Sequence, residues 1–295
     1  MAQRFEPNMA RLTAEFHVGF NIVLAIVFLR LLDPLASLLT KLLPDRKTAI
    51  DPSAPRYLDE AALDTPSLAL ANAARETLHM GDTVEAMLKN VMTALKTNDR
   101  ALVTEISRMD NIVDSLNEAV KLYLTNLTRS NLDEREAKRA MEILSFAINL
   151  EHIGDIIEKN LSELAAKKIK RNVQFSDDGA TEIDEFYKRI LENLRLAFGV
   201  FMSGDVSGAR KLVAEKAQVR SAELTAAERH LERLREGRPE TLETTSLHLD
   251  VLRDLKRINS HICSVAYPAL ETVKETSAKP EESATTRAKP KPRGR

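Results

Sequence analysis

Two pairs of acidic residues, spaced four apart in the sequence, are the residues of this chain best placed to do chemistry. Asp110 and Asp114 form the first pair, and Glu151 and Asp155 form the second. In an α-helix, residues four apart project from one face about a turn apart. If the two faces meet, four carboxylates converge, and oxygen-preferring cations favour such an arrangement. We therefore predict a site for a divalent or trivalent metal ion (Fe, Mn, Mg or Zn) at these four residues.

The acid pairs have a simpler interpretation that the sequence leaves open. Carboxylates on a helix commonly face solvent and pair with a nearby Lys or Arg. If they do converge without a cation, their mutual repulsion raises the pKa of some of them. His152 follows Glu151 directly but projects about 100° away around the helix. We therefore do not expect His152 to act as a metal ligand.

The chain carries the same helical pattern twice, and the charges are inverted in the second copy. Segments around both acid pairs recur at offsets of 105 to 106 residues, with apolar and small residues retained. At the positions of the four acids, the second copy has Lys216, Arg220, Lys256 and Ser260. These cations exclude a second metal site of the same kind. They would attract an anion such as phosphate, dock against acids elsewhere, contact a partner, or face solvent.

Composition indicates long helices and excludes several classes of function. The 295 residues include only 9 glycines and no tryptophan, which is typical of helical proteins. The formal net charge of −1 gives no reason to expect nucleic acid as a partner. The single Cys263 excludes an internal disulfide. No phosphate-binding loop, dinucleotide glycine pattern or nucleophile elbow occurs, so we predict that the chain is not an enzyme.

Apolar spacing and cap residues predict six helices. Asp99 and Asp205 are natural N-caps after tight connections. Short connections make neighbouring helices antiparallel, and each helix has an apolar stripe to bury. We predict an all-α fold of two tandem antiparallel three-helix bundles, at residues 67–171 and 178–275. The expected helices are 67–97, 99–128, 132–171, 178–203, 205–236 and 239–275.

The segment before the bundles indicates a membrane attachment. Residues 1–44 contain an apolar stretch long enough for one spanning helix, at about 18–43. Basic residues follow this stretch, and the positive-inside rule then predicts an inner (plasma) membrane protein with its helical domain cytoplasmic. Prolines punctuate residues 45–66, which we interpret as a linker. Residues 276–295 have the composition of a disordered tail.

The acid-bearing segments resemble the PhoU domain family. In that family, a helix of the bundle carries a signature similar to Leu150-Glu151-His-Ile-Gly-Asp155, and acid pairs spaced four apart line metal clusters. The segment that begins at Leu255 is similar to PhoU-like domains at the C-terminus of sodium-dependent phosphate (Na/Pi) cotransporters. The apolar stretch after His17 resembles the last membrane segment of those cotransporters. The resemblance covers roughly residues 10–272.

The resemblance implies a membrane-attached regulatory part of a sodium-dependent phosphate cotransporter, involved in phosphate transport or its regulation. The alternative is a phosphate-signalling adaptor that binds a transporter or a sensor kinase. The implied partners are the membrane and the transport core or another subunit of a phosphate transporter, and a homo-oligomer stays open. This chain departs from the family because its second copy lacks the acids, which allows one metal cluster at most.

Overall fold

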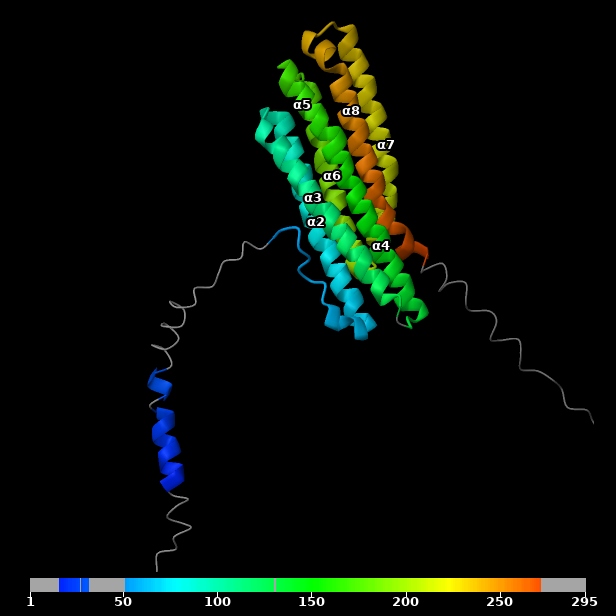
Figure 1. Ribbon diagram of the computed structural model, residues 1–295. Coiled ribbons are helices and arrows are strands. Elements are labelled where there is room, and N and C mark those ends of the chain that lie inside the picture. Colours follow the sequence, from blue (N-terminus) through cyan, green and yellow to red (C-terminus); the bar gives the residue numbers. More distant parts are fainter. Residues whose placement is uncertain (1–15, 27, 32–50, 130, 272–295) are drawn as a thin grey trace, which may run out of the picture. The chain divides into compact units, whose positions relative to one another are not determined.

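The computed structural model describes residues 16–26, 28–31, 51–129 and 131–271, and these residues form helices joined by short connections (Figure 1). The predicted all-α fold is confirmed for this part of the chain. Contacts between residues divide the chain into two units, Met1–Asp51 and Pro52–Arg295. Each unit is described by itself.

The first unit contains helical residues 16–26 and 28–31. A spanning helix needs about 20 consecutive apolar residues. Within the described ranges, no helix has both the length and the apolar character to cross a bilayer. This finding contradicts the predicted inner-membrane location. The rest of the predicted 18–43 helix and the predicted tail at 276–295 lie outside the described residues.

The first three-helix bundle opens the second unit. The N-caps at Asp99 and Asp133 accept hydrogen bonds from backbone amides, and Glu136 completes a capping box with Asp133. The third long helix is interrupted by a π-helical turn, which the sequence pattern did not predict. The elements are η1 Glu60–Asp64, α2 Pro66–Thr97, α3 Arg100–Leu127, α4 Glu134–Asp155, the π-helix η2 Ile156–Leu161 and α5 Ser162–Arg171.

The second bundle repeats the arrangement with α6 Asp177–Ser203, α7 Val206–Arg235 and α8 Pro239–Ile262. Asp205 caps α7 as predicted, because its carboxylate accepts hydrogen bonds from two backbone amides of the first turn. The last helix was expected to continue to residue 275. In the structure, α8 ends at Ile262, the 3-10 turn η3 Cys263–Val265 interrupts it, and residues 266–271 are helical again. Residues 272–275 lie outside the described part of the chain.

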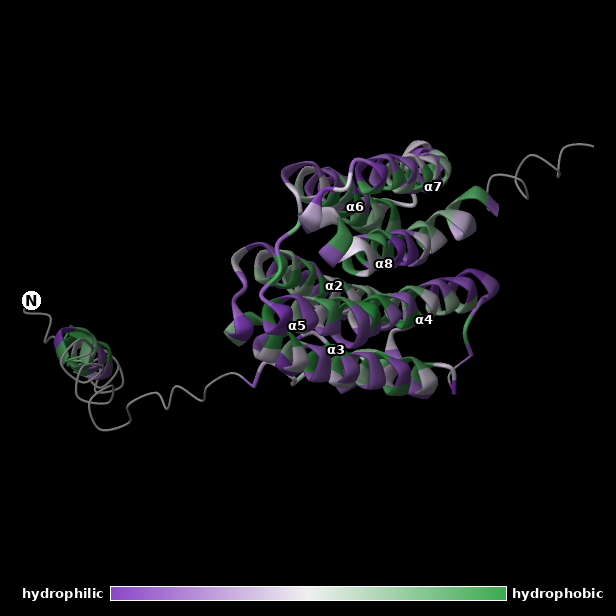
Figure 2. Ribbon diagram, turned by 90° about the horizontal axis from the view of Figure 1, so that it is seen from above, coloured by the Kyte–Doolittle hydropathy of each residue, from purple (hydrophilic) through white to green (hydrophobic). Residues whose placement is uncertain are grey.

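Each bundle buries an apolar stripe from all three of its helices, as the view from above shows in Figure 2. Leu88, Leu116 and Leu150 are fully buried in the first bundle. The two bundles contact each other through α2 with α6 and through α4 with α8. Gly81 lets α2 and α6 approach, because a β-carbon there would lie 2.7 Å from Cε1 of Phe198.

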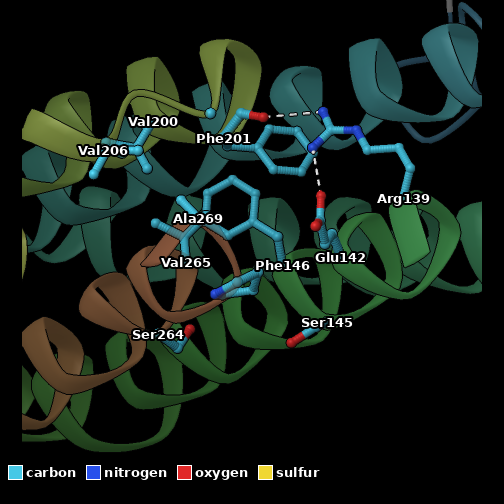
Figure 3. Close-up of a pocket in the computed structure, with 12 residues that line it drawn as sticks. Arg139, Glu142, Ser145, Phe146, Val200, Phe201, Val206, Ser264, Val265 and Ala269 are labelled. Atoms are coloured by element: carbon cyan, nitrogen blue, oxygen red, sulfur yellow. Dashed lines mark hydrogen bonds and ion pairs between the residues drawn. The ribbon is translucent and has the colours of Figure 1, made fainter. Parts of the chain in front are cut away.

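A cavity of about 370 Å³ lies beside the contact between the bundles (Figure 3). The rings of Phe146 and Phe201 form its apolar wall, with centroids 4.6 Å apart. Arg139 closes one side: Nη2 donates to the Phe201 carbonyl at 2.9 Å, and Nη1 donates to Glu142 at 3.1 Å. The guanidinium therefore ties α4 of one bundle to α6 of the other.

Candidate functional site

Three of the four predicted acids lie in one electrostatic cluster. Asp110 and Asp114 lie on α3, and Asp155 is the last residue of α4. The negative charges of Asp114, Asp155 and Glu158 all act on Asp110. We call Asp110, Asp114, Asp155 and Glu158 the acid cluster. The structure brings the first three of these residues together, and Glu158 was not predicted from the sequence.

Asp110 is the buried member of the acid cluster, with 8% of its surface exposed. Burial and then the neighbouring carboxylates raise the pKa of Asp110 to about 7. Its Oδ1 has no hydrogen-bond partner within the described part of the chain. A β-carbon at Gly154 would lie 3.1 Å from this oxygen. The glycine in the α4 signature therefore leaves room for the Asp110 carboxylate.

Lys159 supplies a positive charge to the acid cluster. Its Nζ lies 2.6 Å from Oδ1 of Asp155, four residues earlier. That hydrogen bond, and then the attraction of Asp155, Asp110 and Asp114, raises the pKa of the Lys159 ammonium. Lys159 belongs to the π-helix η2, and such turns are frequent at functional sites. Sequence reasoning missed Lys159, although its i, i+4 spacing from Asp155 was the available signal.

The fourth predicted acid, Glu151, is engaged elsewhere. Oε2 of Glu151 lies 2.9 Å from Nδ1 of its neighbour His152. The two side chains were expected to project apart around the helix, whereas they are in contact in the structure. Whether His152 is a metal ligand is a separate question, and it was not expected to be one. Among the described residues, no group of three or more His, Cys, Asp or Glu side chains is arranged to hold a metal ion.

The donor chemistry of the acid cluster suits a hard cation only in part. Carboxylate oxygens are the ligands that such ions prefer, and the buried Asp110 oxygen lacks a partner. However, the Lys159 ammonium already pairs with Asp155. A metal ion therefore stays a prediction for Asp110, Asp114, Glu151 and Asp155.

The basic residues of the second copy make separate contacts. Lys216 lies 3.2 Å from the hydroxyl of Tyr267 and above its ring. Lys256 pairs with Glu223 at 2.7 Å, and Arg220 is exposed. The proposed anion or partner contacts at these three residues stay a prediction.

The second bundle contains a buried charged cluster that the sequence did not reveal. Arg233 donates to both carboxylate oxygens of Glu182, at 2.9 and 2.7 Å. Burial alone would raise the pKa of Glu182, but His248 and Arg233 outweigh it and lower this pKa to about 2. The rings of His230 and His248 stack with centroids 4.8 Å apart. These four residues come from three helices, so only the fold brings them together.

Comparison with known families places this pair of bundles in a defined class. The PhoU domain matches the chain twice, at residues 77–164 and 183–269. One match lies in each bundle, and together they cover more than half of the chain. The chain therefore belongs to the PhoU domain family.

Particular relatives and solved structures agree with this class. The chain is 39% identical over 272 residues to YjbB of Escherichia coli (strain K12), named as a candidate inorganic phosphate export protein. The YjbB of Salmonella typhimurium is 39% identical over 265 residues. These matches cover 92% and 89% of this chain but 50% and 48% of the relatives. The chain thus spans about half the length of the curated relatives it matches.

Two solved structures share the fold. PhoU from Pseudomonas aeruginosa aligns with a TM-score of 0.64 at 19% identity, over 70% of this chain and 97% of that one. The phosphate transport system regulatory protein PhoU from Streptococcus pneumoniae aligns with a TM-score of 0.63 at 16% identity, over 72% and 98%. The predicted PhoU-like fold is confirmed by these alignments.

Proposed function

We propose that this chain is a PhoU-type phosphate-signalling adaptor, which regulates phosphate movement by binding a component of a phosphate transport system. The observation that carries the proposal is the pair of PhoU domain matches, one on each bundle. The name of the Streptococcus pneumoniae structure, a phosphate transport system regulatory protein, supports the same class. The helical surfaces, rather than a catalytic centre, are then the working parts of the molecule.

A cation at the acid cluster is part of this proposal. Asp110, Asp114, Glu151 and Asp155 would hold a divalent or trivalent ion such as Fe, Mn, Mg or Zn, and Glu151 would leave its contact with His152 to do so. The supporting observation is the buried Asp110 oxygen without a partner, surrounded by like charges. A bound cation would offset this repulsion and link α3 to α4. The second bundle has cations at the matching positions, so the proposal restricts the ion to the first bundle.

A second candidate function follows from the relatives. The 272-residue match to the candidate inorganic phosphate export protein YjbB is longer than the described bundles. The chain would then be the PhoU-like regulatory part of a longer phosphate transport protein, of the Na/Pi cotransporter type that the resemblance implies. Immunoblotting of native cell extract separates the two candidates, because the second requires a product about twice the length of this chain.

The adaptor proposal is tested by affinity purification of the tagged chain from its own cells, followed by mass spectrometry. We expect a component of a phosphate transport system or a sensor kinase among the specific partners. The Asp110→Ala/Asp155→Ala variant tests the cation separately, by elemental analysis of the purified protein. We expect it to lose the bound metal, and an unchanged metal content in this variant rules out the cation site.

A further inference from the structure

A second cavity, of about 310 Å³, lies where α4 and the π-helix η2 of the first bundle face α8 of the second. We call it the seam cavity. Its lining includes His152, Lys159, Asn160, Arg257 and His261, together with Asp155. Both copies of the repeated signature therefore contribute residues to one hollow. None of the residues predicted from the sequence as anion contacts lines it.

The lining of the seam cavity holds more cations than acids. Lys159 and Arg257 are cations, and Asp155 is the one acid in the lining. Arg257 uses Nη1 to contact Oδ1 of the buried Asp254 at 2.9 Å, and 48% of its side chain stays exposed. A guanidinium has five N–H donors and an ammonium has three. Each cation therefore keeps donors for a ligand after its contact with the protein is made.

The imidazole of His261 reports the same positive environment. Burial, and then the charges of His152, Arg257 and Lys216, lowers the pKa of His261. The His261 Nδ1 lies 3.0 Å from Oδ1 of Asn149, whose amide nitrogen donates to the Ser145 carbonyl. This hydrogen-bond network leaves Oδ1 as the acceptor, so the Nδ1–H of His261 donates. The ring is thereby held in one orientation beside the cavity.

We propose that the seam cavity binds a compact oxyanion of the phosphate type, with Lys159 and Arg257 supplying the charge and Asn160 an amide donor. Arg presents a planar fork of donors that matches phosphate oxygens, and Lys adds a point charge. Because Lys159 comes from the first bundle and Arg257 from the second, a bound oxyanion would bridge them. The site would thus convert phosphate concentration into a tighter contact between the two bundles.

Direct titration with inorganic phosphate tests the proposal on the purified chain at low ionic strength. We expect saturable binding that Arg257→Gln weakens about 10-fold, the loss expected when one charge-assisted hydrogen bond is removed. The matched control is Arg253→Gln. Arg253 lies one turn earlier on α8, contacts the same Asp254 at 3.6 Å and is 52% exposed, but it does not line the cavity.

The NMR signals of the His261 ring provide a local readout. Phosphate should shift them at the same concentration in the wild type and in Arg253→Gln, whereas Arg257→Gln should need about 10-fold more phosphate for the same shift. Absence of phosphate binding by the folded wild type overturns the proposal, as does an equal loss in the two arginine variants. Circular dichroism verifies that each variant is folded.

The choice of phosphate as the ligand rests on the proposed function. The inference that the cavity binds an anion rests only on the cations that line it. The two claims fail separately. If the chain captures a phosphate transport component but binds no phosphate, the seam cavity is not an oxyanion site and the adaptor function stands. If phosphate binds but no such component is captured, the adaptor function fails and the site stands.

Discussion

The Nζ of Lys159 lies 2.6 Å from Oδ1 of Asp155, and Lys159 also lines the seam cavity. Together with Asp155, which also lines this cavity, Lys159 therefore connects the acid cluster of the first bundle with the hollow between the bundles. In the described structure, the ammonium acts as a counter-ion for carboxylates that would otherwise repel one another. A cation at the acids would displace this ammonium, and an oxyanion in the cavity would attract it. The two proposed ligands should therefore bind cooperatively.

Removal of the Lys159 charge should strengthen cation binding at the acid cluster. In Lys159→Met, a divalent ion no longer competes with the ammonium for Asp155. Exposed ion pairs of this kind contribute about 0.2–1 kcal/mol, so we expect Mn²⁺ to bind up to about fivefold more tightly in titration calorimetry. Lys167→Met is the matched control, because Lys167 pairs with Glu163 at the same i, i+4 spacing. Unchanged or weaker Mn²⁺ binding in Lys159→Met contradicts the competition.

The buried Asp110 should cost the metal-free protein stability at neutral and higher pH. Its pKa of about 7 in the folded chain lies above the ordinary value of 3.8. As pH rises from 3.8 to 7, the unfolded chain loses the proton first, so the free energy of unfolding falls. Asp110→Asn removes this cost, and we expect it to gain about 1–3 kcal/mol at pH 8 in chelator.

Chemical denaturation at pH 5 and pH 8 measures this effect, and the gain from Asp110→Asn should shrink at the lower pH. Asp114→Asn is the control, because Asp114 is exposed on the same helix. An equal gain in both variants would mean that surface repulsion, and not burial of Asp110, sets the cost.

The pair formed by Arg233 and Glu182 should be a major contributor to the stability of the second bundle. Both side chains are largely buried, at 7% and 11% exposed. Arg233→Met leaves the buried Glu182 carboxylate with His248 but without its guanidinium partner, which costs about 3–5 kcal/mol. The double variant Arg233→Met/Glu182→Leu removes both charges and should cost less than Arg233→Met alone. Urea unfolding measures both, and a larger loss in the double variant disagrees with this account.

Acid should destabilise the second bundle through His230. Burial, and then the charges of His248 and Arg233, lowers the pKa of His230 to about 4, against an attraction from Glu182. Below pH 6.5, His230 binds a proton in the unfolded chain but stays neutral in the folded chain. Its contribution to the free energy of unfolding is therefore fully present above pH 6.5 and is lost as the pH falls towards 4. Protonation of Glu182 removes more between pH 4.5 and 2. In thermal melts, His230→Leu should show a flatter dependence on pH between 7 and 5 than the wild type.

Local sequence rules predicted the helices well and the site only in part. The caps at Asp99 and Asp205 follow from short-range hydrogen bonds, so they could be located without a structure. The spacing of Asp110 and Asp114 fixed a shared face for the same reason. The π-helical turn at η2 changes the helical phase through backbone hydrogen bonds, which residue spacing does not encode.

Some residue pairs could not be predicted from the sequence because they depend on contacts between distant segments. Arg257 was not among the predicted anion contacts, because only the packing of α8 against η2 places it opposite Lys159. Glu182 and Arg233 are 51 residues apart in the sequence, and their pairing depends on how α6 and α7 pack.

The central claim, that this chain regulates phosphate movement, is tested most directly by the flux of isotopically labelled phosphate. Rates of uptake and export are measured in the parental cells, in cells that lack the chain, and in the latter cells carrying the wild-type chain on a plasmid. The account predicts that loss of the chain changes the phosphate flux and that the wild type restores it. Identical flux in all three strains, across limiting and abundant phosphate, would contradict the account.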